Sequence, residues 1–361
     1  MFENDLCPEC GVSKTFSGEQ AWMDNGDIVQ TRDHGHRLTF IESDNLDPLF
    51  DGISHLIGVS IEPIVIETVR TNMRAYIRRF VPDEVRERVL RKELDPAKID
   101  EAFANMGNPA GYGRYRPVDS RFEGDQDDFI TVSITEPFSL PMCAASHCGA
   151  VEAILGYDHA VTYSQIEPNT WHLVAFPYQQ PRAFVDRLHS ERYERTSGNL
   201  LLERCPSCGC PKGLSMCEWF LERGVIINRP LQRRMALIGS TELNPIFKEL
   251  EDELGDTIPQ IVVEAQRRFT KTGFYSMQDV QTEGDFRVQL ALRGLGLLRE
   301  LKINRRGLHM LVENAALPPM IVGMMQGIFE MSFDLDTYVE WEVSRGNLRM
   351  ELIPKSVAIS A

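Results

Sequence analysis

Apolar and polar residues follow two different spacings along this chain, and each spacing predicts a different element. From Ile61 to Arg79, apolar residues recur every three or four positions, which favours an α-helix with one buried face. Pro82 then ends that helix, because proline has no N–H to donate. A second helix is expected over Leu140–Leu155. Alternating apolar and polar residues predict strands at 129–135, 161–165 and 172–176, the last two as a hairpin.

The same order of segments occurs twice. At an offset of 198 residues, CPECG at 7–11 matches CPSCG at 205–209. At an offset of 197, IGVSIEPIVIETVR (57–70) matches LGDTIPQIVVEAQR (254–267), and at 178, LPMCAASHCGAVE (140–152) matches PPMIVGMMQGIFE (318–330). We interpret this self-similarity as a tandem duplication. The change of offset gives the first copy about 19 extra residues, which we place in the polar stretch Tyr115–Asp128, interpreted as a loop.

These segments predict an α+β protein made of two tandem homologous units, each with an antiparallel sheet packed by helices. The first unit is expected to span residues 1–179 and the second 205–361, each beginning with a CPxCG knuckle. Residues 180–204 form the linker, whose pattern suits a connecting helix that ends near Gly198.

Composition and charge narrow the function classes. With 361 residues, the chain is long enough for two cores. A formal net charge of −15 argues against nucleic-acid binding, which needs a basic surface. The N-terminus MFENDLCPEC has no signal-peptide pattern, and the longest apolar stretch, 315–333, is interrupted by prolines, so no membrane span is expected. We therefore expect a cytoplasmic protein, in which eight cysteines are metal ligands or free thiols rather than disulfides.

Each CPxCG knuckle offers two thiolates from one tight turn, whereas a tetrahedral metal site needs four. Two ligand sets are possible. The first joins both knuckles through Cys7, Cys10, Cys205 and Cys208, and the second is local, with Cys205, Cys208, Cys210 and Cys217. We favour the first set, because Val12 and Glu19 stand where the first copy would need counterparts of Cys210 and Cys217. Zinc is the expected ion for four thiolates, and iron is the alternative.

Candidate pocket residues lie on the two late helices. Cys143 and His147 are four residues apart and share a helical face, next to Cys148. Because the second copy has Ile321, Met325 and Gln326 at these positions, the three residues belong either to a core helix or to a pocket of the first unit alone. Met320 and Met324 line an adaptable apolar pocket or are simply core. His34 and His36 are expected at the surface.

The chain resembles the 4-vinyl-reductase domain, a family of predicted hydrocarbon- or aromatic-binding proteins. The resemblance is carried by PLFDGISHLIGVSIEPIVIETVR and ITVSITEPFSLPMCAASHCGAVEAILG, and by their second-copy equivalents PIFKELEDELGDTIPQIVVEAQR and LHMLVENAALPPMIVGMMQGIFE. It implies an enclosed apolar pocket between helices and sheet, for an aromatic, lipid-like or tetrapyrrole ligand.

We therefore predict a small-molecule binding protein with a structural zinc site that bridges two duplicated units. No catalytic residue is assigned. One alternative is an enzyme, or an enzyme accessory, that acts on such a ligand through Cys143, His147 or Cys148. The other is an interaction scaffold, with a protein partner or a second copy of the chain.

Overall fold

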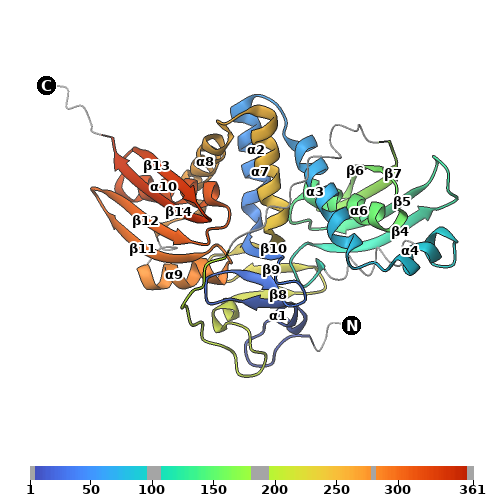
Figure 1. Cartoon of the computed structure of the whole chain (residues 1–361), viewed down its shortest axis with the longest axis horizontal. Coiled ribbons are helices and arrows are strands. Elements are labelled where there is room, and N and C mark those ends of the chain that lie inside the picture. Colours follow the sequence, from blue (N-terminus) through green and yellow to red (C-terminus); the bar gives the residue numbers. More distant parts are fainter. Residues whose placement is uncertain (1–4, 96–106, 180–194, 278–281, 356–361) are drawn as a thin grey trace.

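The computed structural model describes residues 5–95, 107–179, 195–277 and 282–355. It confirms the α+β class, because helices pack on several antiparallel sheets (Figure 1). The predicted linker helix lies largely outside the described residues, and the described part of the linker, 195–203, is not helical. The boundaries of the two units stay a prediction.

A six-stranded antiparallel sheet is built from both copies, which sequence analysis did not anticipate. Its order is β1 (Gln20–Trp22), β2 (Ile28–Gln30), β3 (Arg37–Glu42), β10 (Arg233–Gly239), β9 (Val225–Asn228) and β8 (Cys217–Phe220). At its centre Phe40 pairs with Leu237, its own equivalent at the offset of 197. A pseudo-twofold axis therefore passes between these two residues, and each copy contributes three strands.

Two four-stranded antiparallel sheets flank the central sheet, one from each copy (Figure 1). The first has the order β4 (Arg114–Arg121), β5 (Phe129–Thr135), β7 (Thr170–Pro177), β6 (His159–Glu167), and the second β11 (Leu297–Asn304), β12 (Gly307–Glu313), β14 (Asn347–Pro354), β13 (Thr337–Ser344). The predicted strand and hairpin are confirmed. The loop expected at Tyr115–Asp128 is wrong, because half of it belongs to the edge strand β4, whose central residues are exposed.

The helices pack across the duplication. They are α1 (Lys14–Glu19), α2 (Leu46–Ile57), α3 (Glu62–Arg78), α4 (Asp83–Leu90), α6 (Leu140–Leu155), α7 (Ser240–Leu254), α8 (Ile258–Phe269), α9 (Glu283–Leu292) and α10 (Pro318–Phe333), with short 3-10 or π turns at 43–45, 212–216 and 270–274. In each copy the late helix packs on the long middle helix, α6 on α3 and α10 on α8. However, α2 packs against α8 and α7 against α3, so each copy lends one helix to the other. We call α3, α6 and their sheet β4–β7 the first side, and α8, α10 and β11–β14 the second side.

Small residues permit the close approach of these helix pairs. A Cβ atom on Gly149 would stand 2.3 Å from the carbonyl oxygen of Arg70, and one on Gly323 would stand 2.4 Å from that of Val263. Glycine is therefore required where the backbones meet. The small-residue spacing of the late helices serves helix packing.

A buried ion pair joins the same two helices on each side. On the first side, Arg70 Nη1 lies 2.6 Å from each carboxylate oxygen of Glu152, which also accepts the His159 backbone N–H at 2.7 Å. On the second side, Arg267 Nε donates to Glu330 at 2.8 Å, and the Thr337 backbone N–H donates to the same carboxylate at 3.0 Å. This network accounts for the arginine and glutamate shared by the two copies.

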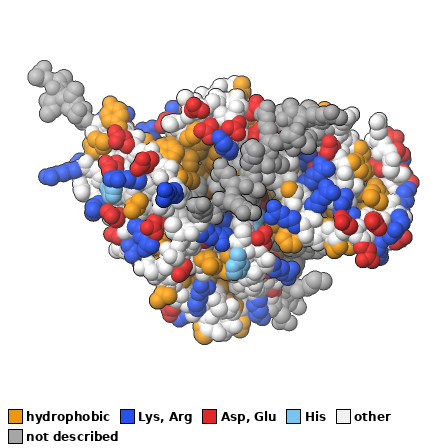
Figure 2. All heavy atoms as spheres, viewed as in Figure 1, with side chains coloured by type: hydrophobic (Ala, Val, Ile, Leu, Met, Phe, Trp, Pro, Cys, Tyr) orange, Lys and Arg blue, Asp and Glu red, His pale blue; other side chains and the backbone are white. Residues whose placement is uncertain are grey.

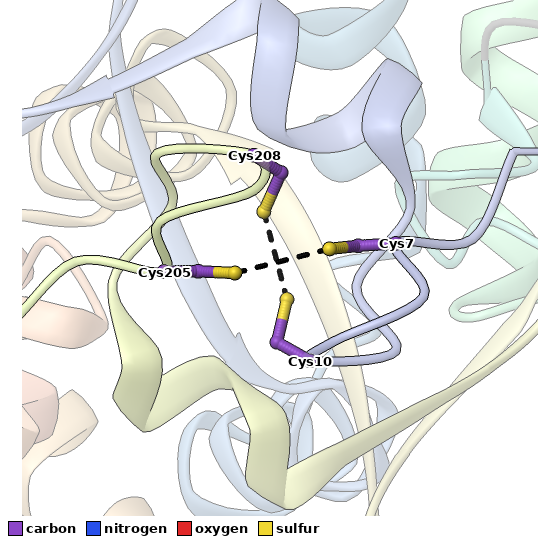
Figure 3. A group of neighbouring side chains, drawn as sticks. All are labelled: Cys7, Cys10, Cys205 and Cys208. Atoms are coloured by element: carbon purple, nitrogen blue, oxygen red, sulfur yellow. Dashed lines mark hydrogen bonds between the residues drawn. The ribbon is translucent and has the colours of Figure 1, made fainter.

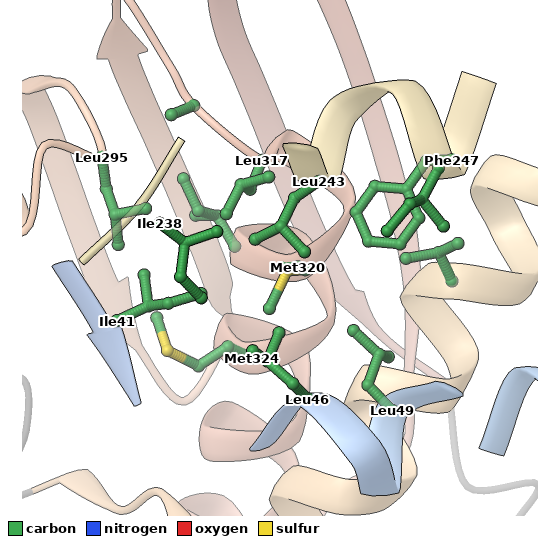
Figure 4. Close-up of a cluster of buried hydrophobic side chains, with 14 of the residues drawn as sticks. Ile41, Leu46, Leu49, Ile238, Leu243, Phe247, Leu295, Leu317, Met320 and Met324 are labelled. Carbon is green, nitrogen blue, oxygen red and sulfur yellow. The ribbon is translucent and has the colours of Figure 1, made fainter. Parts of the chain in front are cut away.

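The largest hydrophobic core contains residues from both copies. Figure 4 shows Met320 and Met324 of α10 among Ile41 and Leu46 from the first copy and Leu243 of α7. Because this core spans the duplication, neither copy buries its apolar surface alone.

Candidate metal centre and ligand cavity

The two CPxCG knuckles fold alike. In the first, the Cys7 N–H donates to the Val12 carbonyl at 2.8 Å and the Gly11 N–H to the Cys7 carbonyl at 2.9 Å. In the second, Cys205 and Gly209 repeat these bonds, each at 2.8 Å. Gly11 and Gly209 have φ values of 73° and 74°, the left-handed conformation that glycine adopts without strain. The glycine that ends each motif thus closes the turn.

The structure brings the four predicted ligands together around one point (Figure 3). All four sulfurs lie within 4.8 Å of one another, and the pairs across the pseudo-twofold are 3.8 Å apart for Cys7 and Cys205 and 3.5 Å apart for Cys10 and Cys208. A tetrahedral ion with metal–sulfur bonds of ~2.3 Å needs sulfurs about 3.8 Å apart. These four cysteines therefore have the spacing to hold a metal ion between the two copies.

A fifth thiol lies beside this cluster. The sulfur of Cys210, which is buried, is 3.3 Å from that of Cys208 and 3.7 Å from that of Cys10. Cys217 is buried at the start of β8 and does not belong to the four-sulfur group. The geometry thus favours the bridging set over the local set, with Cys210 adjacent to it.

The knuckle backbone supports negative charge on sulfur. Hydrogen bonds from the backbone of Cys10 and Glu9 lower the pKa of the Cys7 thiol to about 7. Burial raises the pKa of Cys10 to about 12. A bound cation would offset that desolvation, because metal binding displaces the thiol proton.

On the first side, a cavity of about 160 Å³ lies between the central sheet and the helices α3 and α6. We call it the first cavity. The central sheet contributes Leu38 and Leu237, and α3 contributes Met73 and Ile77. Its lining also includes Tyr76, Tyr112, Tyr115, Ser146, Ala150 and Glu242. Glu242 comes from the second copy, because α7 packs against α3, so the cavity is completed only by both copies.

Glu242 is the main ionisable group of this wall. It follows Gly239, the residue that caps α7, and the Gly239 N–H hydrogen-bonds its carboxyl, as in a capping box. Burial nevertheless raises the pKa of Glu242 to about 7. Its other oxygen, Oε2, is buried and has no hydrogen-bond partner.

His36 lines the cavity close to Glu242, and sequence analysis placed it wrongly at the surface. It is buried, and its ring lies 4.7 Å from that of Tyr76, centroid to centroid. Burial lowers its pKa to about 4, so the imidazole is neutral at pH 7. The hydroxyl of Tyr76 in turn accepts a hydrogen bond from Gln30. His34 is exposed, as expected.

The predicted pocket residues are not in one place. His147 lines the first cavity, with Nε2 3.1 Å from the Ile130 carbonyl oxygen. Cys143 and Cys148 are fully buried and do not line it. Met320 and Met324 line a second, smaller cavity of about 30 Å³ on the second side, within the main core.

Sequence reasoning missed Glu242 and His36 as cavity residues. The self-alignment did contain a signal, because Glu242 stands opposite Asn45 and His36 opposite Arg233 at the offset of 197. A change of charge at equivalent positions marks a place where the copies differ in chemistry. This signal could not be placed in the first cavity from the sequence, because it is the packing of α7 against α3 that brings Glu242 there.

No protein-family model and no curated protein sequence matches the chain. Among solved structures, similarity is found to a Cs H-NOX mutant with 4-cyano-L-phenylalanine, at 17% identity over 34% of this chain and 77% of that chain, with a TM-score of 0.24. A mutant of T. Tengcongensis H-NOX gives 18% identity over 34% and 77%, with a TM-score of 0.23. A structure described as probing heme distortion in the H-NOX family gives 16% over 33% and 74%, with a TM-score of 0.23. TM-scores this low establish no common fold with these proteins.

The charge distribution on the surface and the character of the helices add two observations that bear on possible partners. On the face in Figure 2, acidic and basic side chains are interspersed. Within the described residues, no helix combines the length and apolar character needed to cross a membrane.

Proposed function

We propose that this chain is a small-molecule binding protein whose ligand occupies the first cavity and whose two copies are joined by a structural zinc ion. The observation that carries the proposal is the first cavity itself. It lies between helices and a sheet, as the resemblance to the 4-vinyl-reductase domain implies for that family's pocket. That family assignment is part of the proposal.

The volume of the cavity favours a small ligand. An apolar cavity of about 150 Å³ in another protein admits benzene, and the first cavity measures about 160 Å³. Pockets for larger ligands measure roughly 300–1,000 Å³. We therefore favour a ligand with one ring over a tetrapyrrole.

Binding is favoured over catalysis by the state of the two thiols. Burial raises the pKa of Cys143 to about 11 and that of Cys148 well above its ordinary value. The thiolate is the nucleophilic form of cysteine, and neither thiol lines the first cavity. The enzyme alternative thus loses two of its three candidate groups.

Calorimetric titration with toluene tests the binding proposal. We expect one saturable site per chain. Ser146→Met should abolish it, because this change copies Met324, the second-side equivalent, and fills the first cavity. Met324→Ala is the matched control and should retain binding. Unchanged binding in Ser146→Met would show that the ligand lies elsewhere.

Metal analysis with an absorption spectrum tests the zinc proposal. Four thiolates are typical of structural zinc, which is colourless, whereas iron–thiolate sites are strongly coloured. We expect one zinc ion per chain and no visible absorption. A coloured protein with one iron ion per chain would show that the site holds iron and not zinc.

A further inference from the structure

The wall of the first cavity is acidic and aromatic. Among the described residues that line it, Glu19 and Glu242 are acids, three are tyrosines, and none is lysine or arginine. Aromatic faces carry negative potential and attract cations. The wall therefore has the charge sign that suits a cation.

Two acceptor oxygens of the same wall are without donors. Glu242 Oε2 and Gln20 Oε1 are both buried and accept no hydrogen bond. Glu242 as a whole is only 7% exposed. Buried acceptors are ordinarily paired, so unpaired ones along a cavity indicate a ligand that brings its own donors.

On the second side, arginine side chains supply the positive charge that the lining of the first cavity lacks. Arg233, the equivalent of His36, packs on the rings of Phe274 and Tyr275 at 4.8 Å from each centroid. Arg233 and Arg293 both form ion pairs with Glu42. The second side thus contains its own cations over aromatic rings, whereas the described lining of the first cavity has carboxyls, tyrosines and two histidines but no lysine or arginine.

Helix capping explains only part of Glu242. The Gly239 N–H engages the carboxyl group, but a cap leaves Oε2 unused. Asn45, the equivalent on the other side, donates instead to Gln266 at 2.8 Å. A carboxyl therefore stands where the fold itself needs only a neutral polar group.

We propose that the first cavity binds a small organic cation, a primary ammonium group carried on a single ring, with the ammonium donating to the Glu242 carboxylate. This inference rests on the proposed function, since it assigns the ligand class of the same cavity. The ring occupies the apolar part of the cavity, near Leu38, Met73 and Leu237. The charge-assisted hydrogen bond gives the preference for a cation over a neutral ring.

Three probes of nearly equal size test the inference by calorimetry at about pH 8, where amines remain charged. They are benzylamine, benzyl alcohol and toluene. We expect benzylamine to bind at least about tenfold more tightly than benzyl alcohol. If all three probes bind with equal affinity and Ser146→Met abolishes their binding, the cation inference is overturned and the proposed function stands. No binding of any probe would overturn the proposed function.

Two variants locate the preference. Glu242→Gln should lower the affinity for benzylamine about tenfold and leave that for benzyl alcohol within about twofold. Glu242→Asn copies the second side and provides a second test should the glutamine variant fold poorly. Glu19→Gln, on the same wall, is the matched control. If Glu19→Gln loses the preference for benzylamine and both Glu242 variants keep it, the cation binds Glu19, and its assignment to Glu242 is wrong.

Discussion

The two sides of the pseudo-twofold share a framework and differ in their interiors. Helix pairs, sheets and the buried arginine–glutamate pair recur on both sides. Yet the first side has a cavity of about 160 Å³ and the second one of about 30 Å³. Residues kept in both copies therefore define the scaffold and the cysteine cluster, whereas residues that differ between the copies line the first cavity.

At two positions the second side carries a larger side chain than the first. Ser146 on the first side is replaced by Met324 on the second, which adds bulk to the equivalent helix face. Gly239 is replaced by Glu42, whose carboxylate forms ion pairs with two arginines. The second interior is therefore filled by side chains that the first side lacks.

The metal cluster belongs to both sides equally, so its removal should have the largest effect. Cys7→Ala and Cys205→Ala should each lose the metal and unfold at much lower temperature, because structural zinc contributes on the order of 10 kcal/mol of binding free energy. Metal content and thermal unfolding measure this. Cys210→Ala is the control and should keep the ion. Metal retained in Cys7→Ala and lost in Cys210→Ala would establish the local ligand set instead.

The buried ion pair allows a direct comparison of the sides. Glu152→Gln should destabilise the protein by up to about 3–5 kcal/mol, because it removes the fully buried carboxylate that pairs with Arg70 and leaves only the ion pair with Glu67. Glu330→Gln should cost less, since Arg267 is 17% exposed against 4% for Arg70. Urea unfolding of both variants checks the order. Equal losses would mean that the difference in exposure has no energetic consequence.

Glu242 should give the first side a distinct pH dependence. Its folded pKa, about 7, lies above the ordinary 4.5, so the folded state holds the proton more tightly. Stability from this group is therefore complete below pH 4.5 and lost as pH rises to about 7. Unfolding free energies of wild type and Glu242→Gln should diverge across this window by up to about 3 kcal/mol.

The neighbours of Glu242 do not titrate in that window in the same direction. Burial lowers the pKa of His36 to about 4, and burial raises the pKa values of Tyr76 and Tyr112 above 10. The difference between wild type and variant therefore isolates Glu242. A constant difference between pH 4.5 and 7 would contradict a raised pKa.

The smallest effect should come from making the first side resemble the second. Ser146→Met should raise stability by about 0.5–2 kcal/mol, as cavity filling commonly does. Thermal unfolding without ligand measures it. A loss of stability would indicate that the helix face around Ser146 cannot accommodate the longer side chain.

Local features were readable from the sequence. Proline and glycine at fixed positions predicted both knuckles, and helical spacing predicted α3 and α6 closely, because these signals depend on neighbouring residues. The edge strand β4 was missed, because its exposed residues, such as Arg116 and Asp119, carry no apolar alternation.

Contacts between the copies were not readable. Nothing in the spacing of residues tells β3 to pair with β10, or α7 to pack on α3, since both depend on association of distant segments. The first cavity depends on that association, because Glu242 reaches it from the other copy. Residues chosen on one helix alone, such as Cys143 and Cys148, therefore missed it.

The pairing of Phe40 with its own equivalent has an evolutionary consequence. A strand that pairs antiparallel about its own centre is the isologous contact of a symmetric dimer. A chain with one copy would meet a second molecule through that strand, place four thiols at the same junction and exchange a helix with it. In such a dimer every substitution appears twice. Joining the copies in one polypeptide removes this constraint, so one interior can close while the other stays open.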